Sequence, residues 1–137
     1  MIRQRLHIDR YGWDVTVYHA VSQYWADEIY RHLLSIGCSG EYAKGAYENL
    51  QRSELNTGLT YSNLRDRVSV VVIALTSSAE EYINSFCHEL RHLCNHIEEG
   101  CDIDSGSEEA CYLAGDLAAQ MYRESHKLMC DNCRSHE

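Results

Sequence analysis

The chain has 137 residues, which suits one domain that buries roughly two thirds of its unfolded surface. A formal charge of -9, with twelve scattered Lys and Arg residues, disfavours binding to nucleic-acid phosphates. No apolar run approaches the roughly 20 residues that span a bilayer, and the N-terminus lacks a signal-peptide core. The sequence therefore predicts a cytoplasmic protein that binds neither nucleic acid nor membranes.

The first half of the chain predicts a β-hairpin followed by two helices. Apolar and polar residues alternate over residues 5–21, as in paired strands. Apolar residues then recur at helical spacing over residues 23–36, and a second helix is expected over residues 40–51. Residues 53–63 are polar and include Gly58, so we expect a loop there.

The second half predicts one strand followed by two helices. Residues 68–75 are β-branched and nearly all apolar, which is typical of a strand buried on both faces. A capping box then opens a helix that runs to about residue 98, before Gly100 stops it. Two boxes fit, Ser77 with Glu80 and Ser78 with Glu81. A last helix over residues 108–128 completes an α+β domain with a hairpin, one further strand and about four helices.

Residues 88–92 form an HExxH motif inside a predicted helix, which is the context that this motif requires. At roughly 100° per residue, His88 and His92 share one side of the helix, opposite its apolar stripe. Residues four apart have Cβ atoms about 5–6 Å from each other, so both imidazoles can bind one zinc ion. Glu89 lies beside this pair and is predicted to act as a general base on a metal-bound water.

Catalytic zinc usually takes three protein ligands, so the motif needs one more. His96 lies about 12 Å from His88 along a straight helix, which excludes it as a ligand of the same ion. Glu109 lies at the edge of the apolar face of the last helix, whereas Glu108 points to water. We therefore predict Glu109 as the third ligand. The alternatives are Glu108, Asp102, Asp104 and His126.

Three side chains near Glu109 in the sequence are candidates for an outer shell around the metal. Tyr112 and Asp116 lie on the same side of the predicted helix as Glu109, and His126 follows further along. Peptide hydrolysis also needs a donor to the developing oxyanion, for which Tyr112, Tyr61 and His126 are equal candidates. An extended peptide could pair with the strand over residues 68–75, if that strand lies at an edge of the sheet.

HExxH on one helix and a glutamate on the next resemble the gluzincin metallopeptidases. Residues 88–92 with His96, followed by Glu108-Glu109-Ala110, look most like short ImmA/IrrE-type proteins. Residues 56–61 and 76–80 also resemble small HExxH proteins of phages and mobile elements. The resemblance implies a single zincin-like domain over residues 1–137, with a zinc site of His88, His92 and Glu109 and a catalytic Glu89. Arg91 and Cys111-Tyr112 depart from the ImmA-type pattern but leave the ligands intact.

Seven cysteines cannot all pair within one chain, and a cytoplasmic protein keeps most thiols reduced. Cys130 and Cys133 have the CxxC spacing of a tetrahedral thiolate site, but no second pair lies nearby. The sequence favours two free thiols in a loosely ordered tail over residues 126–137, with a second zinc site as the alternative.

Zinc-dependent hydrolysis of a peptide or protein substrate is the function that these features predict. The alternative is a catalytically silent zinc domain that acts as a structural or protein-interaction module. The presence of Glu89 favours the enzyme over the silent module, because a purely structural metal site needs no base beside the metal.

Overall fold

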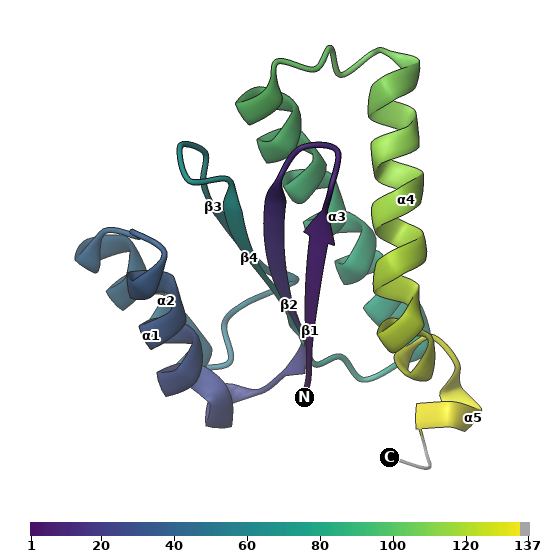
Figure 1. The fold of residues 1–137 in the computed structure, drawn as a ribbon. Coiled ribbons are helices and arrows are strands. Elements are labelled where there is room, and N and C mark those ends of the chain that lie inside the picture. Colours follow the sequence, from purple (N-terminus) through teal and green to yellow (C-terminus); the bar gives the residue numbers. More distant parts are fainter. Residues whose placement is uncertain (135–137) are drawn as a thin grey trace.

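The computed structural model describes residues 1–134, which form a four-stranded mixed sheet with helices on both faces (Figure 1). This confirms the predicted α+β class. The strands are β1 (Ile2–Ile8), β2 (Trp13–Val21), β3 (Gly58–Asn63) and β4 (Val68–Ala74). The helices are η1 (Gln23–Trp25), α1 (Ala26–Ser35), α2 (Gly40–Gln51), α3 (Ala79–Cys101), α4 (Glu108–Ser125), η2 (His126–Leu128) and α5 (Asp131–Arg134). No helix within residues 1–134 is long and apolar enough to cross a membrane.

The strand order is β1-β2-β4-β3, so β1 and β3 form the two edges of the sheet. Antiparallel pairing joins β1 to β2 and β3 to β4, whereas β2 and β4 run parallel. Side chains of β4 alternate between two cores, as the period of two in a strand requires. Val70 and Val72 pack with α1 and α2, and Val71 and Ile73 pack with α3 and α4. The predicted hairpin is confirmed, and the buried strand over residues 68–75 corresponds to β4.

Two expectations about the sheet are wrong. The segment 53–63 is only partly a loop, because Gly58 to Asn63 form β3. Every residue of β3 pairs with β4. The possible edge strand over residues 68–75 is instead internal, since β4 has a neighbour on each side. The open edge beside α3 therefore belongs to β3.

The HExxH helix α3 begins after Ser78, the N-cap of one of the two expected capping boxes, although the Glu81 side chain returns to Ser77 and not to the Ser78 amide. Ser78 Oγ accepts a hydrogen bond of 3.2 Å from the Glu81 backbone amide, and Glu81 Oε2 in turn accepts bonds from the Ser77 amide and hydroxyl. Gly100 does not stop the helix, contrary to expectation. The helix continues to Cys101, and Asp102 turns the chain with a φ of 55°.

Gly100 is instead required by close packing against the hairpin. A Cβ atom at this position would lie 2.7 Å from two ring atoms of Trp13, which is fully buried at the start of β2. The absent side chain thus lets the end of α3 approach the sheet.

The last predicted helix, over residues 108–128, is divided in the structure. α4 ends at Ser125, and η2 and α5 follow it. Leu128 is only 3% exposed and belongs to the core between the sheet and α3. Residues 126–134 are therefore anchored to the domain, and the remainder of the predicted tail lies outside the described residues.

Replacing Gly100 by alanine should destabilise the protein by about 1–3 kcal/mol, because the new methyl group meets the buried Trp13 ring. Gly115→Ala is the matched control, since no atom lies within 4 Å of a Cβ there and alanine favours the helix by about 0.5–1 kcal/mol. Urea unfolding of both variants measures the difference. Equal stability of the two would contradict the packing of Gly100 against Trp13.

Candidate metal centre

His88 and His92 lie together on an exposed side of α3. Their ring centroids are 5.0 Å apart, with the ring planes at 67°. The buried stripe of α3, which includes Phe86 and Leu93, faces the sheet instead. The i, i+4 spacing thus produces the adjacent imidazole pair that the motif predicts.

Glu89 occupies the boundary between α3 and the edge strand. The residue is 2% exposed, and both carboxylate oxygens accept hydrogen bonds from threonines near or within β3. Thr57 Oγ1 donates to Oε2 at 2.7 Å, and Thr60 Oγ1 donates to Oε1 at 2.9 Å. Two hydroxyl donors suit an ionised carboxylate, which accepts hydrogen bonds only. Sequence reasoning missed both threonines, because it assigned their segment to a loop.

His96 is joined to the core by a chain of hydrogen bonds. Its Nδ1 lies 2.7 Å from Ser62 Oγ, which lies 2.6 Å from Ser69 Oγ, and the Trp13 indole donates to Ser69 at 2.8 Å. Burial lowers the pKa of His96, and the neighbouring His92 lowers it further. His96 is thus a neutral side chain that ties α3 to β3.

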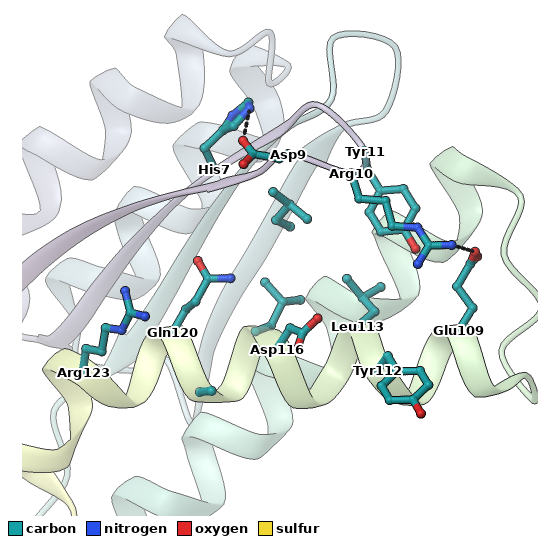
Figure 2. Close-up of a pocket in the computed structure, with 13 residues that line it drawn as sticks. His7, Asp9, Arg10, Tyr11, Glu109, Tyr112, Leu113, Asp116, Gln120 and Arg123 are labelled. Carbon is teal, nitrogen blue, oxygen red and sulfur yellow. Dashed lines mark hydrogen bonds and ion pairs between the residues drawn. The ribbon is translucent and has the colours of Figure 1, made fainter.

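Glu109 lies on another surface, in a groove of about 510 Å³ between α4 and the β1–β2 turn (Figure 2). Its Oε1 accepts a bond of 2.9 Å from Arg10 Nη2. Tyr112 and Asp116 line the same groove, so the structure does bring these three predicted residues together. It does not group them with His88 and His92.

The remaining candidate ligands have separate surroundings. His126 Nδ1 lies 3.0 Å from the Tyr122 carbonyl, Asp104 accepts a bond from the Gly106 amide, and Asp102 forms the end of α3. Glu108 is exposed, as the helical periodicity predicts. Cys130 and Cys133 are also exposed.

The two imidazoles fit zinc, because neutral ring nitrogens are preferred ligands and residues four apart on a helix can share an ion. Within residues 1–134, no three His, Cys, Asp or Glu side chains gather as a complete protein metal site. The pair could therefore supply at most two of the four positions of a tetrahedral zinc shell.

A polar groove of about 470 Å³ lies beside the first half of α3. Thr57, which donates to Glu89, is part of its wall, and Asn84 lies one helical turn before His88. The other lining residues are Asn56, Thr76, Ser78, Glu80, Glu81 and Ser85. The groove thus ends next to the motif and offers hydroxyl, amide and carboxylate groups to a bound chain.

Comparison with protein-family models, curated proteins and solved structures gives no match to this chain. The gluzincin resemblance consequently depends on the motif and its spacing.

Thr60→Val should lower the free energy of unfolding by about 1–3 kcal/mol, because it removes a donor to a buried carboxylate. Thr60→Ser keeps the hydroxyl and should retain most of the stability. Urea unfolding compares the two. If valine is tolerated as well as serine, the hydrogen bond to Glu89 does not stabilise the junction of α3 and β3.

Proposed function

We propose that this chain is a cytoplasmic, gluzincin-type zinc peptidase, with His88 and His92 as metal ligands and Glu89 as the general base. The observation that carries the proposal is the adjacent imidazole pair on α3, with the Glu89 carboxylate in the next position along the helix. The substrate is a peptide or protein, which agrees with a polar groove and an open strand edge beside the motif.

Zinc between the two imidazoles would polarise a peptide carbonyl and acidify a bound water. Glu89 would accept the proton of the attacking water. A carboxylate has about four lone-pair sites, of which the two threonines occupy two, so Glu89 retains capacity for another hydrogen bond. Thr57 and Thr60 would hold the carboxylate in this position through their hydrogen bonds.

β3 is the element against which an extended substrate would pair. It is an edge strand, and a peptide can extend a sheet by hydrogen bonding to such an edge. Thr60 and Ser62 contact α3 from this strand, so a chain added to β3 would run close to the histidines. The groove next to Thr57 would receive one of its side chains.

Glu109 as the third ligand stays a prediction. Its present partner is Arg10, in an ion pair whose side chains are 35% and 68% exposed. Exposed ion pairs contribute roughly 0–1 kcal/mol, so the contact with Arg10 adds little to the position of Glu109, which is set by the burial of Leu113, Leu117 and Met121 of α4. Substitution of Glu109, with Glu108 as its neighbour and control, tests this role directly.

A catalytically silent zinc module is the second candidate function, and the burial of Glu89 favours it. Both oxygens of this carboxylate are bonded to threonines, so Glu89 also serves to hold α3 on β3. In that case the imidazole pair would bind zinc to stabilise the domain or to join it to a partner protein.

Purified wild-type protein should contain about one zinc per chain. His88→Ala and His92→Ala should each abolish zinc binding, because each leaves only one imidazole of the pair to hold the ion. Elemental analysis measures the content. His7→Ala is the control, since His7 is exposed on β1 beside the groove between α4 and the β1–β2 turn.

The same measurement tests the third ligand. Loss of zinc in Glu109→Gln but not in Glu108→Gln would support Glu109 as a ligand. Wild-type protein that holds no zinc and takes up none would refute the metal site.

Glu89→Gln should keep its zinc and lower peptide hydrolysis by about 10²–10⁴-fold, which is the typical contribution of a general base. A quenched fluorescent peptide library measures the rate, and Glu99→Gln supplies an exposed carboxylate on the same helix as the control. Urea unfolding shows whether Glu89→Gln remains folded. Zinc-loaded wild type that cleaves nothing favours the silent module. A Glu89→Gln variant that hydrolyses peptides at the full rate would refute Glu89 as the general base.

A further inference from the structure

The end of the described chain is fastened to the start of the HExxH helix. Asp131 Oδ1 accepts a bond of 3.0 Å from the backbone amide of Ala79, the first residue of α3. Arg134 donates to the Leu128 carbonyl at 3.1 Å and also to the carbonyl of Thr76. The contacts with Ala79 and Thr76 span 52 and 58 positions of sequence, and they fix the short helix α5 on the domain.

Cys130 and Cys133 are held one turn apart at this helix, and both are exposed. The Cys133 thiol and the backbone amides of Asn132 and Cys133 hydrogen-bond to the Cys130 sulfur, which lowers the pKa of Cys130. Cys94 is a contrast within the same chain, because burial raises its pKa to about 11. Cys130 is therefore both accessible and the more readily ionised of these two thiols.

We propose that Cys130 and Cys133 form a redox-active dithiol that exchanges with small disulfides such as oxidised glutathione. The Cys130 thiolate attacks one sulfur of the disulfide, so that a mixed disulfide forms and one glutathione thiolate leaves. Cys133 then loses its proton and attacks the Cys130 sulfur, which closes the intramolecular disulfide and releases the second glutathione thiolate. The protein dithiol is oxidised, and one glutathione disulfide is reduced to two thiols.

The anchoring of α5 makes this pair suited to rapid exchange. Asp131 lies within the CxxC turn and Arg134 follows it. Both residues are hydrogen-bonded to other parts of the domain, so the turn is already formed. Cys133 thus meets Cys130 without a search through the conformations of a loose tail. This dithiol does not depend on the metal site for its chemistry.

Its position nevertheless connects it with α3. Thr76, whose carbonyl binds Arg134, lines the polar groove beside the HExxH helix. The anchor of the dithiol turn and the wall of the groove thus share this residue.

The test uses the full chain in buffers of reduced and oxidised glutathione, with the products identified by peptide mass mapping. Wild type should form a disulfide between Cys130 and Cys133 without a lasting adduct. Cys133→Ser should accumulate glutathione on Cys130, because the resolving thiol is absent, whereas Cys130→Ser should react several-fold more slowly. Cys111→Ser, which removes another exposed thiol, should behave as wild type.

Alkylation by iodoacetamide at neutral pH provides a second measurement. Cys130 should react about threefold or more faster than Cys111, since a lowered pKa increases its thiolate fraction. A lasting glutathione adduct on wild type, or equal alkylation of Cys130 and Cys111, would overturn the proposal. Thiols that are unreactive until a chelator removes zinc would also overturn it and would identify a metal site at the same residues.

Discussion

The packing of α3 against the sheet determines where every residue of the HExxH motif points. Tyr82, Phe86, Leu93 and Ile97 are buried in one core with β2 and β4, so rotation of the helix would expose this whole stripe to water. The orientation that buries them leaves His88 and His92 in solvent and turns Glu89 toward β3. Hydrophobic burial thus separates the two imidazoles from the carboxylate on a single helix.

Periodicity within one element was sufficient for most of the fold. The β-branched run of β4, the alternation of the hairpin and the helical spacing in α1 and α3 are local signals, and each predicts its element. β3 lacks such a run, because its composition is polar and it begins at a glycine. Its alternation is nonetheless present, since Leu59 and Tyr61 face α1 and α2 while Thr60 and Ser62 face α3. Pairing with β4 converts that weak pattern into a strand.

The candidate site was predictable only to the extent that it lies on one helix. The spacing of His88 and His92 determines their proximity whatever surrounds α3. Glu109 is at the edge of the packed face of α4, as its periodicity indicates, but periodicity does not say which neighbour lies at that edge. In the structure the neighbour is Arg10 of the hairpin turn and not α3. The rotation of α4 about its axis depends on side-chain packing with the whole domain, which no single segment encodes.

The parallel pairing of β2 with β4 also has a consequence for how the chain folds. α1, α2 and β3 all lie between these strands in the sequence, so the central pair of the sheet is a non-local contact with a large entropic cost of closure. Until β4 has been synthesised, the β1–β2 hairpin lacks its inner neighbour, and an isolated two-stranded hairpin is marginally stable in water. The unpaired backbone edge of β2 and its apolar side chains are therefore exposed during translation, when association with other nascent chains competes with folding.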